Sequence, residues 1–288
     1  EFGDNDGAAV GGLWVGDDVA VRVYGAAFGD NEGQSGAVHL GAGAQAVLYD
    51  GLFSGNQAAA NGGALSVGVG ASATCLRCTW ENNGADSLGG AVWVAAWGSF
   101  GDAEGAWMAN EASGPDGRAG SLFAEADTVV DISDGTLSGG GVSAWSFDHS
   151  TARFTDCVLD GSSPMVADAG QLTLSRVAWL SAAWPDETAV SVRDGAALTV
   201  AGANALGLAG AFSIEASTAT FADCALDYGA NTAIVATDGA SLSLSDCTFT
   251  GNEGGGIWAQ DSMVTLDNSV FLQNGVDTGS ALSVAAPL

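Results

Sequence analysis

The sequence predicts an all-β fold, a parallel β-solenoid of about 12 coils that occupies residues 1–288 as a single domain. Two observations predict it. Two short sequence words recur at intervals of 20 to 30 residues, each beside a run of three to five residues with strand-like alternation. No stretch keeps the period of a helix, because Gly, with 44 copies among 288 residues, interrupts almost every window long enough to show one.

The first word is an aromatic residue followed three positions later by Asn, as in Phe53-Ser-Gly-Asn56. Seven of the 12 Asn residues end such a word: Asn5, Asn31, Asn56, Asn83, Asn110, Asn252 and Asn274. Asn suits a sharp bend because it tolerates positive φ. Coils about 4.8 Å apart would also let each amide bond its equivalents above and below. We therefore expect an Asn ladder and, beside it, aromatic rings stacked in the core.

The middle of the chain keeps the interval but loses the Asn word. There the same interior slot is expected at five residues: Leu137, Leu159, Trp179, Leu206 and Leu226. The longest interval falls near residues 95–136, which contain Gly114-Pro-Asp-Gly117. We expect a longer coil to protrude there and to offer a place for specific contact.

The second word is Gly-Gly-Ala before an apolar residue, as in Gly62-Gly-Ala-Leu65, and it leads into an apolar-x-apolar triplet that predicts a very short strand. The middle residue of each triplet points outward, and stacked coils place these residues in one column. Five of them carry rings: Trp14, His39, Trp93, Phe123 and Trp258. Exposed rings in a row favour a surface for a protein partner or a second copy of the chain, and less strongly for a glycan. The alternative is that loops or a neighbouring chain cover them.

The two words together resemble a known repeat. Phe53-Ser-Gly-Asn56 followed by Gly62-Gly-Ala-Leu65 is similar to the repeat pair of the polymorphic outer-membrane proteins first described in Chlamydia. The similarity extends over residues 1–110 and 249–288, whereas 111–248 keeps only the interval. It implies a right-handed parallel β-helix, secreted by a bacterium or held at its outer-membrane surface, that acts as an adhesin or a passenger domain.

The positions of the five Cys residues allow two candidate disulfides. Cys224 and Cys247 fall in adjacent coils, at a spacing that a disulfide accepts, and export would supply the oxidant. Cys75 and Cys78 are the second candidate pair. The alternative for both is a pair of free buried thiols, since Cys packs as a small hydrophobe. Because Cys75-x-x-Cys78 lacks a second Cys pair or a nearby His, a zinc site is not expected.

Acidic corners raise the question of calcium. Gly3-Asp-Asn-Asp-Gly7 and Gly29-Asp-Asn-Glu-Gly33 repeat one pattern in successive coils. Stacking would gather the oxygen atoms of four residues that could bind Ca²⁺: Asp4, Asp6, Asp30 and Glu32. Neither segment has the spacing of a known calcium loop, so the alternative is solvated turn residues.

Charge excludes two classes of partner. The chain has 34 Asp and Glu residues against 6 basic residues, all Arg, and a net charge of -28. Nucleic acids and anionic membrane surfaces bind clustered cations, so neither is expected as a partner. No window approaches the roughly 20 apolar residues of a membrane helix, so direct membrane insertion is not expected. Both ends fall inside the repeat pattern, which favours a mature or partial chain.

We therefore expect a non-catalytic adhesin, stalk or assembly subunit. The alternative is a β-helix that binds or cleaves a polysaccharide. Cleavage would need convergent carboxylates and basic groups, yet Asp17-Asp18 is the one adjacent Asp pair, and Asp148-His149 with Arg153 the one grouping of His, Asp and Arg. The second grouping reads more readily as a turn than as a catalytic site.

Overall fold

The computed structural model describes residues 1–113, 119–138, 144–160, 164–180, 188–207, 210–275 and 281–285. These residues form strands and turns, which confirms the predicted all-β solenoid. Contacts divide the chain into a first unit, Glu1–Ala152, and a second unit, Arg153–Leu288. The single-domain assignment stays a prediction, and each unit is described by itself. None of the described residues forms a helix that could span a membrane.

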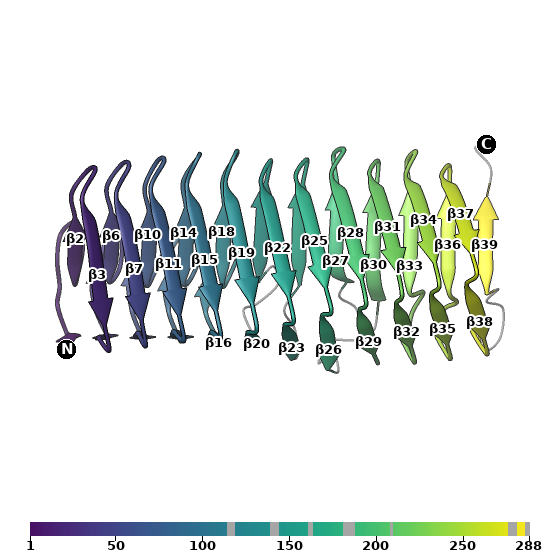
Figure 1. The fold of residues 1–288 in the computed structure, drawn as a ribbon, viewed down its shortest axis with the longest axis horizontal. Helices are drawn as coiled ribbons and strands as arrows, with labels where there is room; N and C mark the ends of the chain where they lie inside the picture. Colours follow the sequence, from purple (N-terminus) through teal and green to yellow (C-terminus); the bar gives the residue numbers. More distant parts are fainter. Residues whose placement is uncertain are drawn as a thin grey trace. The chain divides into compact units, whose positions relative to one another are not determined.

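Each coil of the first unit adds one strand to each of three parallel sheets (Figure 1). The anchor sheet contains β1 (Phe2–Gly3), β4 (Ala27–Gly29), β8 (Leu52–Ser54), β12 (Thr79–Glu81), β16 (Ala106–Met108) and β20 (Thr136–Ser138). The triplet sheet contains β2 (Leu13–Val15), β6 (Val38–Leu40), β10 (Leu65–Val67), β14 (Val92–Val94), β18 (Leu122–Ala124) and β21 (Trp145–Asp148). The long-strand sheet contains β3 (Ala20–Tyr24), β7 (Gln45–Tyr49), β11 (Ser72–Leu76), β15 (Ser99–Ala103) and β19 (Val129–Ser133).

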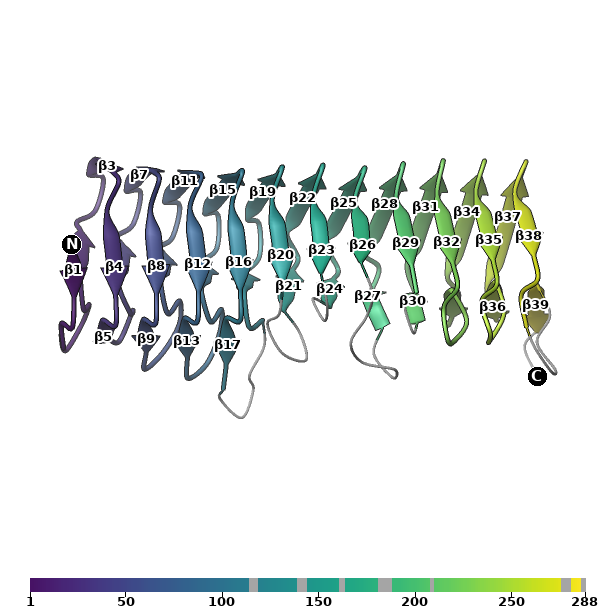
Figure 2. The same cartoon turned by 90° about the horizontal axis from the view of Figure 1, so that it is seen from below.

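A fourth, short sheet lies beside the anchor sheet of the first unit (Figure 2). It contains β5 (Glu32–Gly33), β9 (Gln57–Ala58), β13 (Gly84–Ala85) and β17 (Glu111–Ala112). Strand β22 (Thr151–Thr155) contains the boundary between the units.

The second unit repeats the three-sheet plan. Its anchor sheet contains β23 (Val158–Asp160), β26 (Ala178–Leu180), β29 (Asn204–Leu206), β32 (Ala225–Asp227), β35 (Thr248–Thr250) and β38 (Val270–Leu272). Its triplet sheet contains β24 (Met165–Asp168), β27 (Thr188–Arg193), β30 (Gly210–Glu215), β33 (Ile234–Thr237), β36 (Ile257–Gln260) and β39 (Leu282–Ala285). Its long-strand sheet contains β25 (Gln171–Ser175), β28 (Ala197–Ala201), β31 (Thr218–Ala222), β34 (Ser241–Ser245) and β37 (Met263–Asp267). The two units together contain twelve described anchor strands, one for each of the about 12 coils expected.

Stacked rings fill the core of the first unit. Phe28, Phe53 and Trp80 follow one another in register, with ring centroids 5.0 and 4.4 Å apart and nearly parallel planes. Trp107 continues the column 5.1 Å beyond Trp80. All four side chains are fully buried. Because equivalent residues of parallel coils lie directly over one another, one aromatic residue per coil produces a continuous stack.

The anchor column of the second unit corrects one expected position. Ala205, not Leu206, is in register with Trp179 and Leu226 and points inward. Leu206 is 51% exposed. Side chains alternate between the two faces of a strand, so an error of one residue reverses the direction of the side chain. Because this coil lacks the Asn word, the sequence pattern did not distinguish whether Ala205 or Leu206 points inward.

The corner before the Asn ladder also differs from the expectation. The residue with left-handed backbone is the one preceding the ladder Asn, as in Asp4, Asp30, Asn82 and Ala109, with φ between 49° and 55°. The same position is Gly55, with φ of 68°, in the coil between them. The ladder Asn residues are therefore placed there by their side-chain hydrogen bonds and not by tolerance of positive φ.

The expected protruding coil around 95–136 is mostly regular. Strands β15 to β19 all lie within it, and β15, β16 and β18 pair in register with the preceding coil. The extra length is confined to residues 113–121, between β17 and β18, where the preceding coil has 86–91. Residues 114–118, which include Gly114-Pro-Asp-Gly117, lie outside the described residues.

Candidate functional site

The interior of the long-strand sheet in the first unit contains a carboxyl group, that of Asp102 in β15. Its neighbours in register are Cys75 of β11 and Ile132 of β19, and Leu48 of β7 lies one coil further. Asp102 is 3% exposed. A column that is otherwise apolar or sulfur-containing therefore holds an ionisable group that water does not reach.

Two tryptophans hold one oxygen of this carboxyl group. The indole Nε1–H of Trp107 donates to Asp102 Oδ2 at 2.7 Å, and that of Trp80 donates to the same oxygen at 3.2 Å. The other oxygen, Oδ1, is buried and has no hydrogen-bond partner among the described residues. Burial raises the pKa of Asp102 to about 7, because the charged form loses its hydration, and the two indole donors oppose this rise.

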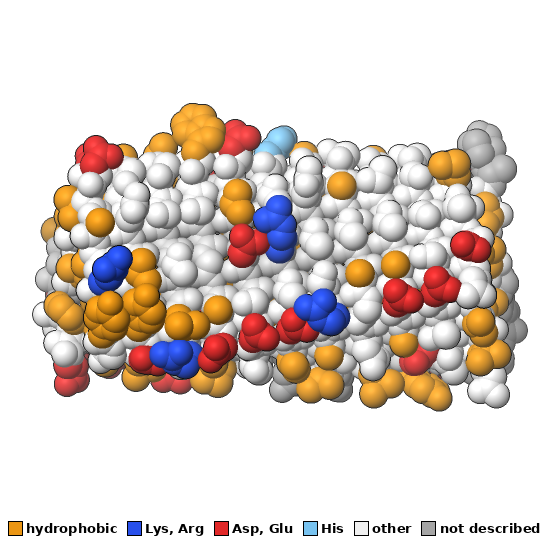
Figure 3. Space-filling model, viewed as in Figure 1, with side chains coloured by type: hydrophobic (Ala, Val, Ile, Leu, Met, Phe, Trp, Pro, Cys, Tyr) orange, Lys and Arg blue, Asp and Glu red, His pale blue; other side chains and the backbone are white. Residues whose placement is uncertain are grey.

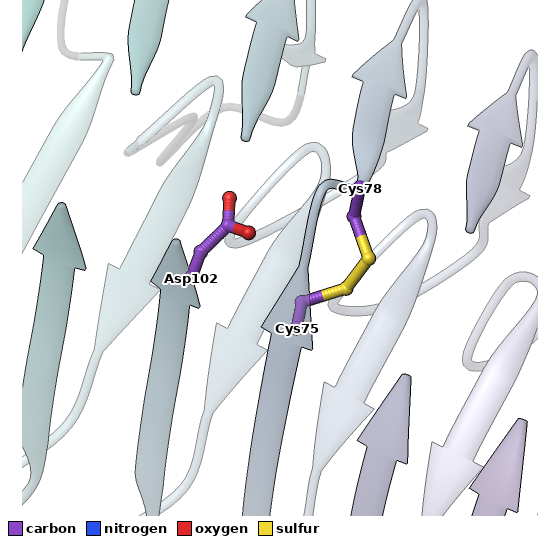
Figure 4. A group of neighbouring side chains, drawn as sticks. All are labelled: Cys75, Cys78 and Asp102. Atoms are coloured by element: carbon purple, nitrogen blue, oxygen red, sulfur yellow. A yellow bond between two sulfur atoms is a disulfide. The ribbon is translucent and has the colours of Figure 1, made fainter. Parts of the chain in front are cut away.

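A disulfide joins Cys75 to Cys78 beside this group (Figure 4). Both residues are buried, and their Cα atoms are 6.0 Å apart. Arg77, between them, turns the corner with φ of 55°, which brings Cys78 back over the end of β11. This is one of the two pairs considered from the sequence.

The two sulfur atoms and a carboxylate oxygen of Asp102 all lie within 4.8 Å of one another. Within the described part of the chain, this is the one group of three or more His, Cys, Asp or Glu side chains close enough to hold a metal ion. Glycines flank the group. A Cβ on Gly51 would lie 3.4 Å from Cys78 Sγ, and a Cβ on Gly105 would lie 2.0 Å from Asp102 Oδ2. Larger residues at these positions would crowd or displace the cluster.

The seven predicted Asn residues occur in two ladders. In the first unit, Nδ2 of each Asn donates to Oδ1 of the next, over 2.7 Å from Asn5 to Asn31, and then 2.8, 2.9 and 3.0 Å on to Asn56, Asn83 and Asn110. In the second unit, Asn252 donates to Asn274 over 2.9 Å. The side chains from Asn31 to Asn110 are 0 to 1% exposed. Their amides thus satisfy one another away from water.

The aromatic column of the triplet sheet is only partly exposed. Trp14, His39, Ser66, Trp93 and Phe123 are in register along the first unit. Trp14 is 57% exposed, and its ring centroid lies 4.6 Å from that of His39. Phe123 is 6% exposed, which corrects its assignment to an open surface.

Part of the column is covered by a loop, which was one alternative to an open aromatic surface. Ser66 is buried under the loop that contains Asn61, to whose carbonyl its hydroxyl donates. Trp258 belongs to the second unit, where its register neighbours are Val235 and Ser283. The described aromatic column of the first unit therefore consists of Trp14, His39 and Trp93.

The expected calcium ligands do not converge. No three of the four expected ligand side chains offer oxygens within 4.8 Å of one another: Asp4, Asp6, Asp30 and Glu32. All four are exposed. The corner geometry explains this, because the carboxylate of Asp30 lies over Gly55 of the next coil, where a Cβ would meet it at 2.3 Å. Because the Asp30 carboxylate is directed toward the next coil, it does not point to the same position as the other expected ligands, as the ligands of one calcium ion must.

A polar cleft does run along the short sheet of the first unit. Asp6, Glu32 and Asp86 line it together with the amides of Gln34 and Gln57. Its volume is about 420 Å³. Carboxylates and amides can bind the hydroxyl groups of an uncharged ligand, whereas three carboxylates repel an anionic one.

Cys224 and Cys247 are free thiols, which corrects the second disulfide considered from the sequence. Their coils are in register, since Thr248 N–H donates to Cys224 O at 2.8 Å. In stacked coils the Cα–Cβ bonds of equivalent residues are parallel and their Cβ atoms are about 4.8 Å apart. The Cβ–Cβ distance in a disulfide is shorter, roughly 3.8 Å. The Cys224 pKa is raised by the hydrogen bond with Cys247 and by burial. The same bond lowers the pKa of Cys247 to about 7.

Charged side chains at the corners pair between adjacent coils. Arg77 donates to Asp50 at 2.7 Å in the first unit, and Arg176 donates to Asp156 at 2.6 Å in the second. Figure 3 shows such acidic and basic side chains side by side along the surface. The Arg77 hydrogen bond holds the pKa of Asp50 below its ordinary value. These groups bind the neighbouring coil instead of pointing into a shared cleft.

Sequence reasoning missed Asp102. The signal was present in Ser99-Phe-Gly-Asp-Ala103, where an Asp replaces the second inward apolar residue seen in Gln45-Ala-Val-Leu-Tyr49. An acidic residue in a chain with 34 of them attracts no notice until its position in the coil is known.

A family model described as right handed beta helix region matches residues 120–271, slightly more than half of the chain. The family supports the expected right-handed winding. No curated protein matches the chain at a significant level.

Proposed function

Because the chain belongs to the right-handed β-helix family, we propose that it is a non-catalytic bacterial surface or secreted protein, an adhesin, stalk or assembly subunit built on a rigid scaffold. Members of such a family differ in function, so the proposal rests on what the side chains of this chain do. Similarity to the polymorphic outer-membrane repeats adds the bacterial surface as the expected location.

The observation that carries the proposal is where the polar side chains are used. Buried Asn amides bond the Asn of the next coil, as Asn56 does with Asn83. Corner carboxylates bond the next coil as well: Asp17 Oδ1 accepts the N–H of Ala42, and Asp50 pairs with Arg77. Groups committed to stacking coils stiffen a solenoid, whereas catalysis needs such groups to converge on a substrate.

The disulfide supports an exported location. Cys75 and Cys78 are bonded and buried in the core. Disulfides persist in oxidising compartments and are rare where thiols are kept reduced. The corner at Asp148 and His149 supports the non-catalytic part, because His149 has φ of 47° and pairs with the adjacent Asp148 at 2.6 Å, as a turn would.

We propose that the aromatic column Trp14, His39 and Trp93 binds a protein partner, with a second copy of the chain as the first candidate. Trp14 and His39 form a ring contact on the outer face, which offers apolar area for association. Light scattering over a concentration series measures self-association. Trp14→Ser should weaken it, whereas Trp97→Ser should not, because Trp97 is also exposed but lies at a corner outside the column.

A polysaccharide panel tests the non-catalytic part of the proposal. We expect no release of reducing ends or unsaturated products from neutral or acidic glycans. Turnover by the purified chain that is lost on replacing a cleft carboxylate would overturn the proposal. A strict monomer that binds a glycan would overturn the assembly version and favour the second candidate.

That second candidate is binding of a neutral glycan in the cleft along the short sheet. Three carboxylates and two amides line this cleft, and such groups can bind sugar hydroxyls. If this candidate is right, Glu32→Gln or Gln57→Ala should weaken binding of the chain to neutral glycans on an array. Trp14→Ser should leave it unchanged, because Trp14 does not line the cleft.

A further inference from the structure

We propose that Cys75, Cys78 and Asp102 form a redox-gated site for a thiophilic divalent cation of the Zn²⁺ class. When the disulfide is reduced, two thiolates and one carboxylate oxygen become available to one ion. While it is intact, the sulfurs are bonded to each other and the site is closed. This inference is independent of the proposed function.

The donor atoms suit such a cation. The three candidate ligand atoms lie within 4.8 Å of one another. Zinc binds Cys sulfur at about 2.3 Å and carboxylate oxygen at about 2.0 to 2.2 Å, so one ion placed among them could reach all three after the sulfurs separate. The third ligand comes from the next coil, 27 residues beyond Cys75, which is why Cys75-x-x-Cys78 alone did not indicate zinc.

The surroundings of Asp102 are those of a positioned ligand. Oδ2 accepts hydrogen bonds from the indoles of Trp107 and Trp80, and Oδ1 is buried with no partner in the described part of the chain. A buried acceptor left unpaired costs stability, so this oxygen calls for an explanation. Metal-bound carboxylates commonly bond an outer group through their second oxygen, as Oδ2 does here.

Small neighbours leave room for the group. Gly105 occupies the position where a Cβ would overlap the carboxylate of Asp102, at 2.0 Å from Oδ2. Gly51 leaves a distance of 3.4 Å between its Cβ position and Cys78 Sγ. The Phe100 ring packs roughly perpendicular to the rings of Trp80 and Trp107, and all three rings are buried, so the site is enclosed by apolar surface.

Opening the site requires an external dithiol. Its two thiols reduce the Cys75–Cys78 bond by exchange through a mixed disulfide, leave as a cyclic disulfide, and yield two protein thiols. Binding of the divalent cation then displaces the two thiol protons and, where Asp102 is protonated, a third. In an oxidising compartment the disulfide is retained and the site stays closed.

Zinc content tests the proposal. The full-length chain is reduced with a dithiol, freed of oxygen and excess reductant, mixed with ZnCl₂, dialysed against a weak chelator, and analysed for metal by mass spectrometry. We expect about one zinc per chain after reduction and none in the oxidised chain. Cobalt bound in place of zinc should show a thiolate charge-transfer band. Near-UV circular dichroism checks that the core stays folded.

Variants separate this site from other thiols. Asp102→Asn keeps the size and an acceptor for the indoles but removes the charge, and Trp107→Phe removes the shorter indole bond. Trp107→Phe should weaken zinc binding about 10- to 100-fold, because it removes a hydrogen bond to a ligand, and Asp102→Asn, which replaces a ligand itself, should weaken it at least as much. The matched control is Cys224→Ser with Cys247→Ser, which removes another close pair of buried thiols and should leave the zinc content unchanged.

Several outcomes would overturn the proposal. They are a folded, reduced chain that binds no zinc, equal zinc in the oxidised chain, and zinc that survives Cys75→Ser with Cys78→Ser. Zinc bound only by a chain that has lost its near-UV signal, or unfolding on reduction that zinc does not reverse, would overturn it as well. Should the double Ser variant not fold, the oxidised wild type serves as the control without free thiols at the site.

Discussion

Replacing Asn56 by alanine should destabilise the first unit by about 3 kcal/mol or more. The side chain of Asn56 makes four hydrogen bonds in the core. Nδ2 donates to Asn83 Oδ1 and to Phe28 O, both at 2.9 Å. Oδ1 accepts from the backbone N–H of Asn31 at 3.1 Å and from its side-chain Nδ2 at 2.8 Å.

The magnitude follows from the groups that would lose their partner. Truncation leaves the backbone N–H of Asn31, one N–H of its amide and the carbonyl of Phe28 without the bonds that Asn56 provided. Each unsatisfied buried group costs about 1 to 3 kcal/mol. Three of them at the lower end give about 3 kcal/mol. Asn31 and Asn56 are fully buried, so water does not readily replace the lost partner.

Urea unfolding followed by tryptophan fluorescence measures this loss. The control is Asn204→Ala in the second unit, an exposed Asn that should change stability by no more than about 0.5 kcal/mol. If Asn56→Ala lowers the free energy of unfolding no more than Asn204→Ala does, the ladder does not stabilise the coils and the hydrogen-bond argument fails.

Three further predictions concern the buried cluster. Because the pKa of Asp102 is raised in the folded chain, the folded chain keeps this proton at pH values where the unfolded chain has lost it, so stability should fall from about pH 4 to pH 7. Thermal melts of Asp102→Asn should not show this fall, and parallel pH profiles of the variant and the wild type would contradict the prediction. Cys75→Ser with Cys78→Ser should lower the free energy of unfolding by about 2 kcal/mol, the loop-closure value for four residues, and an unchanged urea midpoint would argue against it. Gly105→Ala should cost about 1 to 3 kcal/mol because its Cβ meets the Asp102 carboxylate, and much less when Asp102 is also Ala; equal losses in both backgrounds would show that the crowding lies elsewhere.

Repetition explains why so much of the fold was predictable. A residue that serves in one coil meets its own equivalent in the next, so Phe53 stacks on Phe28 and Asn56 bonds Asn83 whatever the rest of the chain does. Where a coil lacks the marker word, the register becomes ambiguous by one residue, as Leu206 and Ala205 show. Burial in the triplet column was not predictable either, because an outward strand position does not indicate that Phe123 is buried or that the loop containing Asn61 covers Ser66.

The sequence by itself determined the coil interval, the stacked rings, the Asn ladders and the absence of clustered cations, because each of these follows from residue type and spacing along one chain. Only the tertiary structure decided that Asp102 lies beside Cys75 and Cys78, that Cys224 and Cys247 are free thiols, and that the acidic corners do not converge. Those outcomes depend on the register between coils and on which face each side chain takes. A shift of one residue within its strand, for example, would turn the Asp102 side chain out of the core and away from Cys75.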